Sequence, residues 1–112
     1  MSRESLGHFE LLVLLALLRV GDDAYGVPIA RAIEQSSGKQ VILASVYNTL
    51  ERLEEKGMIR STIGQPTRER GGRAKRYFKL EPAGAAAIQK SREILTNMWE
   101  GLEMDGDLTP QM

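Results

Sequence analysis

Residues 57–80 constrain the fold of this chain more than any other part of the sequence. Two short runs typical of strands, 58–63 and 75–80, enclose the glycine-containing loop GQPTRERGGRA. Residues 60–79 carry seven bases and one acid, Glu69, although the whole chain of 112 residues is formally neutral. The sequence therefore predicts a β-hairpin with a basic surface, and the polyanion that such a surface attracts most is double-stranded DNA.

Length and composition exclude several classes of protein. A chain of 112 residues has the length of one domain, so a single domain is expected. It contains no cysteine, which excludes a disulfide framework, a thiolate nucleophile and a cysteine zinc site, and is in keeping with a cytoplasmic protein. The apolar run 11–18 is too short to span a bilayer, so we expect a buried helix and no contact with a membrane.

Three helices are predicted ahead of the hairpin. The first covers about 5–20 and is apolar nearly all round, which predicts burial on more than one side. The second covers about 25–35, with Pro28 tolerated in its first turn. Its expected inner stripe is Ile29, Ala32 and Ile33.

The third helix is expected over 44–56. Ser45 is its candidate N-cap and Gly57 its C-terminal stop. Its inward stripe is Val46, Leu50 and Leu53.

A last helix opens at Glu81 and Pro82 and is expected to continue to about Met104. Leucine or isoleucine recurs every seven residues along it, and further apolar side chains widen this stripe into a seam that needs a partner. The seam consists of Ile88, Ile94, Leu95, Met98, Trp99 and Leu102. Residues 105–112 are expected to be a frayed tail.

Three helices followed by a two-stranded basic hairpin are the order of a winged helix. The predicted fold is therefore mainly α with a small β-hairpin, namely a winged helix-turn-helix plus a long C-terminal helix. The third helix would read DNA in the major groove, and the hairpin, or wing, would contact the neighbouring backbone. The expected DNA-binding residues are Ser45, Tyr47, Asn48, Thr49 and Arg52 on the helix and Arg68, Arg70, Arg73, Lys75 and Arg76 on the wing.

The five helix residues each have a second interpretation. Ser45, Asn48 and Thr49 either bind base edges or phosphate or are ordinary polar residues of a helix. Tyr47 either binds phosphate or packs at the helix surface, and Arg52 either faces DNA or pairs with neighbouring acids on its own helix.

Three segments resemble the PadR family of bacterial transcriptional regulators. SVYNTLERLEEKGMI resembles the family's recognition helix, GGRAKRYFKLEPAG its second wing strand and final turn, and Ala-Tyr-Gly at 24–26 the opening of its second helix. The resemblance implies a homodimer in which the final helix of each subunit packs on the first helix of the other. It also implies a DNA-binding part, 1–80, and a dimerisation helix, 81–104.

The expected dimer interface combines this resemblance with the unpaired apolar surfaces, and consists of Leu12, Leu15, Ile88, Leu95, Met98, Trp99 and Leu102. In multidrug-binding members of the family, paired tryptophans on the final helices sandwich flat aromatic compounds. The position that matches this tryptophan is Leu95, and Trp99 lies one turn further on. Trp99 is therefore either a packing anchor or, with Leu95, a wall of a pocket for a small aromatic effector.

No enzymatic function is expected. The single histidine, His8, begins an apolar helix, and no nucleophile set, metal cluster or cofactor motif accompanies it. The sequence thus predicts a ligand-responsive repressor that binds a near-palindromic operator as a homodimer. The alternative is a winged-helix module that uses the same hairpin to bind an acidic protein surface.

Overall fold

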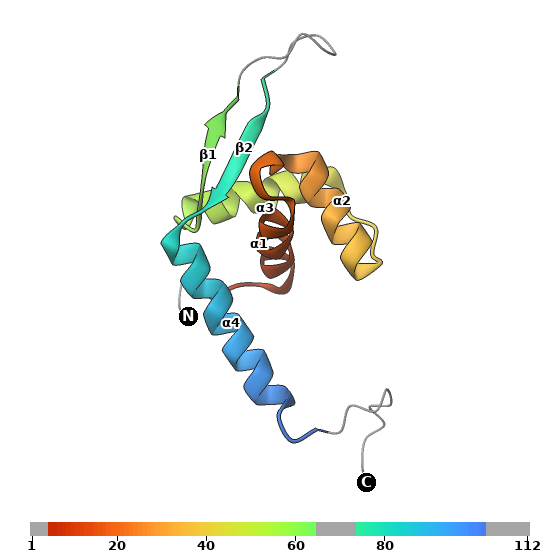
Figure 1. Ribbon diagram of the computed structural model, residues 1–112, viewed down its shortest axis with the longest axis vertical. Coiled ribbons are helices and arrows are strands. Elements are labelled where there is room, and N and C mark those ends of the chain that lie inside the picture. Colours follow the sequence, from red (N-terminus) through yellow and green to blue (C-terminus); the bar gives the residue numbers. More distant parts are fainter. Residues whose placement is uncertain (1–4, 65–73, 103–112) are drawn as a thin grey trace.

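The chain consists of four α-helices, one 3₁₀ turn and a two-stranded antiparallel hairpin, as a computed structural model describes it for residues 5–64 and 74–102 (Figure 1). The predicted fold class is confirmed. The elements are α1 (His8–Val20), η1 (Gly21–Asp23), α2 (Gly26–Ser37), α3 (Leu43–Glu55), β1 (Ile59–Ile63), β2 (Arg76–Leu80) and α4 (Pro82–Trp99).

Helix α1 forms the centre of the core, and α2 and α3 pack on it. Its apolar residues Val13, Leu14 and Leu17 are buried against these two helices. Burial all round α1 is incomplete within this chain, because Leu15 and Leu18 are 39% and 49% exposed. The helix begins at His8 instead of residue 5.

The inner faces of α2 and α3 follow the helical periodicity of the sequence. Val46, Leu50 and Leu53 of α3 are fully buried, as predicted. On α2 the buried set includes Ala30, whereas the expected Ala32 is only half-buried. The expected N-cap was wrong: Ile42 occupies that position, and Ser45 lies inside the first turn without capping it.

The hairpin is attached to the helical body through its second strand. The backbone N–H of Phe78 donates to the carbonyl oxygen of Ala24 at 2.8 Å, and the Phe78 ring is buried. One hairpin face carries the pairs Ile59 with Leu80 and Ser61 with Phe78, and the other carries Arg60 with Lys79 and Thr62 with Tyr77. The hairpin therefore extends from the body beside α3 (Figure 1).

Helix α4 touches the body only near its beginning and then runs away from it (Figure 1). The N–H of Glu81 donates to the Met58 carbonyl oxygen at 2.9 Å, and Gly84 lies directly on the same carbonyl group. Residues 92–102 are all exposed. The helix ends at Trp99 instead of continuing to residue 104, so Leu102 lies beyond it and the expected helical seam is shorter.

Substituting Gly84 with alanine should measure how closely α4 packs on the body. The added methyl group would collide with the Met58 carbonyl, so we expect Gly84→Ala to lower the free energy of unfolding by about 1 to 3 kcal/mol. At an exposed helical site the same change stabilises by about 1 kcal/mol. Urea denaturation followed by circular dichroism measures the difference, with the exposed Ala85→Gly as the control for helix propensity. A Gly84→Ala protein more stable than wild type would contradict the close contact.

Candidate nucleic-acid interface

The exposed side of α3 carries several polar side chains in its N-terminal half. Ser45, Tyr47 and Asn48 are exposed there, and Arg52 is exposed one turn later. Thr49 is a correction, because it is only 2% exposed and lies on the inner stripe of the helix. Its Oγ1 accepts a hydrogen bond from Arg52 Nη2 at 3.3 Å. Thr49 therefore packs on the buried side of α3, and its side chain is not exposed to a groove of DNA.

Tyr47 is positioned by the start of α2. A Cβ atom on Gly26 would collide with the Tyr47 ring, so the ring lies against the backbone of this residue. The Ala-Tyr-Gly segment and the tyrosine of α3 thus form one contact between the two helices, which the sequence patterns alone did not reveal. The packing interpretation of Tyr47 is supported, while the ring remains 40% exposed.

The basic residues of the hairpin are partly neutralised within the chain. Arg76 Nη2 pairs with Glu54 Oε1 of α3 at 2.6 Å, and its Nε donates to Ser61 Oγ at 2.9 Å. Arg60 Nε lies 3.4 Å from Glu81 Oε1. These two guanidinium groups help to hold the hairpin against α3 and α4, so less of the positive charge faces outward than the residue count indicates.

Lys75 lies beside an aromatic pair. Its Nζ is 3.2 Å from the Tyr25 hydroxyl and 4.4 Å from the centroid of the Tyr25 ring, which meets Tyr77 edge to face. The ammonium group is thereby held beside Tyr25, the N-cap residue of α2. Three further predicted DNA contacts, Arg68, Arg70 and Arg73, lie outside the described residues.

Buried Glu10 connects the beginning of α1 with the end of α3. Its carboxylate accepts hydrogen bonds from Lys56 Nζ at 2.9 and 3.1 Å and from the Gly7 N–H at 2.9 Å, and Arg52 Nε lies 3.8 Å away. Burial by itself raises the pKa of the Glu10 carboxyl, but the Gly7 and Lys56 hydrogen bonds and the two positive charges outweigh it. The pKa therefore lies below its ordinary value of 4.5, and the group is held as a carboxylate.

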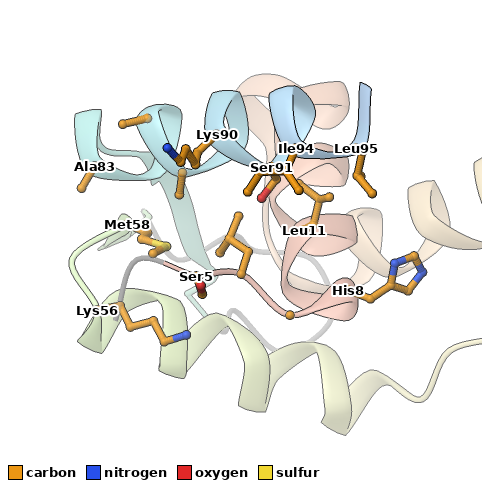
Figure 2. A pocket seen from close by; sticks show the side chains of 14 residues that line it. Ser5, His8, Leu11, Lys56, Met58, Ala83, Lys90, Ser91, Ile94 and Leu95 are labelled. Atoms are coloured by element: carbon orange, nitrogen blue, oxygen red, sulfur yellow. The ribbon is translucent and has the colours of Figure 1, made fainter. Parts of the chain in front are cut away.

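A groove of about 740 Å³ separates α4 from the N-terminal part of the chain (Figure 2). Its α4 wall includes Lys90, Ser91, Ile94 and Leu95, and the opposite side includes Leu11 and Met58. His8 is exposed at its edge. Leu95 thus lines this groove, whereas Trp99 is not among its lining residues.

The expected dimer residues divide into two groups. Leu12 and Ile88 are half-buried and pack against the core of their own chain. The more exposed residues are Leu15, Leu95, Met98, Trp99 and Leu102. The second group leaves apolar side chains of α1, of α4 and of the segment just after α4 exposed by the described part of the chain.

The described part of the chain contains neither a membrane-spanning helix nor a metal-binding cluster. Residues 5–64 and 74–102 contain no helix long and apolar enough to cross a membrane. Within the same ranges, no three His, Cys, Asp or Glu side chains gather as a metal site would require.

The sequence of this chain matches the model of a known protein family. Residues 14–90 match the model of the transcriptional regulator PadR-like family. The chain belongs to this family. The model describes transcriptional regulators, so the chain is assigned to a family of transcriptional regulators.

Two solved structures share the fold of this PadR-like chain. A PadR family transcription regulator from Clostridium difficile R20291 superposes with a TM-score of 0.65 and 20% identity, over 83% of this chain and 95% of that one. BpsR from Bordetella bronchiseptica, whose DNA binding is regulated by 6-hydroxynicotinic acid, superposes with a TM-score of 0.62 and 21% identity. The match covers 93% of this chain and 73% of BpsR. At these identities the likeness shows the fold alone.

A curated relative is more similar in sequence but much longer. An uncharacterized 37.1 kDa protein in transposon TN4556 of Streptomyces fradiae is 34% identical over 89 residues. The match covers 80% of this PadR-like chain and 23% of the relative, so the chain spans about a quarter of that protein's length.

Replacing Glu10 with glutamine should weaken the link between α1 and α3 in a pH-dependent way. Near neutral pH we expect Glu10→Gln to lower the free energy of unfolding by about 1 to 3 kcal/mol, because Lys56 loses its charged partner. Since the folded-state pKa is lowered, the carboxylate's contribution is present above the ordinary pKa of 4.5 and is lost as the pH falls through the folded value. The difference between wild type and variant should therefore shrink as the pH falls below 4.5 and through the lowered folded-state pKa of Glu10.

Urea denaturation at several pH values measures this difference, and Glu51→Gln, an exposed acid on α3, serves as the control. A difference that stays constant down to low pH would contradict a stabilising Glu10 carboxylate.

Proposed function

We propose that this PadR-like chain is a homodimeric, ligand-responsive repressor that recognises a near-palindromic operator. The observation that carries the proposal is the set of exposed polar side chains in the N-terminal half of α3, beside a hairpin that projects from the body. In this proposal Ser45 and Asn48 hydrogen-bond with base edges, and Tyr47 and Lys75 bind the phosphate backbone. Repression would be steric, because the bound dimer occupies the DNA.

The proposed dimer is supported by the uncovered apolar surface of α4. Ile94, Leu95, Met98 and Trp99 are all exposed on one helix, together with Leu15 of α1. A cluster of exposed apolar side chains on one helix is typical of an interaction site, and a second copy presents the same side chains. In this proposal residues 1–80 bind DNA and the helix within 81–104 holds the dimer together.

The proposed effector site is the groove between α4 and the N-terminal part of the chain. It lies between the uncovered helix and the body that carries α3, so a small aromatic molecule bound there would change their relative position. Leu95 supplies part of its wall, and Trp99 follows one turn later on α4. The regulation of BpsR by 6-hydroxynicotinic acid gives a precedent for effector control on this fold. A changed dimer would alter the spacing of the two recognition helices and release the operator.

Selection of binding sites from random double-stranded DNA tests the proposal directly. We expect enrichment of two inverted half-sites whose centres lie about 34 Å apart, one helical turn of DNA. Recovery of no common sequence would contradict operator recognition and favour the protein-binding alternative.

Leu95→Asp tests whether the dimer depends on α4. An aspartate at this position would place an unpaired charge in the interface, so we expect dimer affinity to fall at least about tenfold, with loss of binding to the selected operator. Sedimentation velocity measures assembly, and gel-shift titration measures binding. Gln89→Asp, an exposed position on the same helix, is the charge-matched control. A fully dimeric Leu95→Asp protein would exclude Leu95 from the interface.

The wing should supply affinity that does not depend on DNA sequence. We expect replacement of Arg68, Arg70 and Arg73 with alanine to weaken binding to all duplexes. The slope of log affinity against log salt should become shallower by about 0.9 for each phosphate group that the variant no longer neutralises. Arg60→Ala is the control, because Arg60 already pairs with Glu81, and it should leave the slope nearly unchanged. Equal slopes for wild type and the triple variant would contradict binding of the DNA backbone by the wing.

A further inference from the structure

Large exposed apolar side chains occur at a second place, away from the proposed dimer surface. Ile42 is 72% exposed, and the neighbouring Leu43 is also exposed. They stand at the N-terminus of α3, where Ile42 is the N-cap residue and makes no side-chain cap. Serine, threonine, aspartate and asparagine are preferred at an N-cap because their oxygens accept the free backbone N–H groups. An isoleucine here forgoes that stabilisation and leaves its side chain in water, so helix formation does not explain it.

The chain holds this apolar pair in a fixed position. The N–H of Val41 donates to Glu34 Oε2 of α2 at 3.0 Å, which ties the turn before α3 to the preceding helix. The carbonyl oxygen of Ile42 accepts hydrogen bonds from the N–H groups of Ser45 and Val46 at 2.9 and 3.2 Å. Ile42 and Leu43 are therefore presented by an ordered backbone on both sides.

The charges of α3 indicate which end of the helix approaches DNA. Exposed Glu51 and Glu55 lie in its C-terminal half, and a DNA backbone would repel them. That same end is tied to the chain's own elements, because the Met58 N–H donates to the Leu53 carbonyl oxygen and the Met58 carbonyl oxygen accepts from the Glu81 N–H. The N-terminal half carries no acidic side chain between residues 42 and 50. The N-terminal turn is thus the part of α3 that can enter a groove most deeply, as in other helix-turn-helix proteins.

The edges of the bases offer few apolar partners to such a side chain. In the major groove, the thymine C5-methyl group is the apolar feature of a base pair, and the remaining groups donate or accept hydrogen bonds. Ser45 and Asn48 can satisfy the latter, but neither provides an apolar surface. Ile42 and Leu43 do.

We propose that Ile42, with Leu43 beside it, reads thymine methyl groups in the major groove of each half-site. The inference rests on the proposed function, since it requires the operator that α3 recognises. Ile42 is then a specificity-determining residue that distinguishes thymine from the other three bases by contact with one methyl group.

Replacement of thymine by uracil tests this contact, because the two bases differ only in that methyl group. In the operator recovered by selection, each thymine of one half-site is replaced in turn by deoxyuridine. Wild-type protein should bind about fourfold more weakly when the contacted methyl is missing. Ile42→Ala should bind the thymine and uracil duplexes equally at that position. The control is Ile63→Ala, which removes an exposed isoleucine from the hairpin and should keep the wild-type preference for thymine.

A second variant separates recognition from folding. Ile42→Ser restores an oxygen at the N-cap, so it should raise the melting temperature while abolishing the preference for thymine over uracil. If Ile42 affected the preference only through helix stability, the more stable Ile42→Ser protein would keep its preference for thymine over uracil.

The outcomes distinguish this inference from the function on which it rests. A selected operator whose thymines can all be replaced without loss of affinity overturns the methyl contact and leaves operator recognition intact. An equal thymine preference in wild type and Ile42→Ala does the same. Failure to select any operator contradicts the proposed function itself, and the inference falls with it.

Discussion

The pairing of Glu10 with Lys56 joins the central helix α1 to the end of α3. A carboxylate that is buried must be matched by positive charge and hydrogen bonds, since an unpaired ion is costly in a poorly solvated site. Here Lys56 and the Gly7 N–H provide both, at distances of about 2.9 Å. Because Gly7 precedes α1 and Lys56 follows α3, one side chain links the beginning of the first helix to the end of the third. The orientation of the exposed face of α3 follows from this arrangement.

The hairpin illustrates how a charge count differs from a charged surface. Seven bases against one acid predict a uniformly positive segment, yet Arg76 is paired with Glu54 and Arg60 with Glu81. These acids come from α3 and from the start of α4, so the pairs join the hairpin to its two neighbours. The positive charge thus has a structural part near the body, and the remaining bases toward the loop carry the proposed contact with the DNA backbone.

The sequence predicted the fold well because its signals were local. Hydrophobic periodicity placed Val46, Leu50 and Leu53 inside, and the strand-like runs predicted the hairpin to within a residue at its body end. Thr49 was misassigned because a small hydroxyl residue beside that stripe is compatible with either face, and its burial depends on the packing of α3 against the other helices. The pairing of Arg76 with Glu54 joins residues that are 22 positions apart, and no local pattern reports it. Leu102 fitted a seven-residue repeat, but the helix ends before it, and Gly101 has a φ of 86°.

The contact between Gly26 and Tyr47 also limits how the sequence can change over time. A side chain at position 26 and a full tyrosine ring at position 47 compete for the same space. Any larger residue at 26 requires a smaller one at 47. Either substitution made alone would give a destabilised protein. Residue 47 stands on the exposed face of α3, and residue 26 begins α2. A substitution at residue 47 that changes the proposed DNA specificity is therefore constrained by the size of residue 26. The two positions are expected to vary as a pair among descendants of this protein.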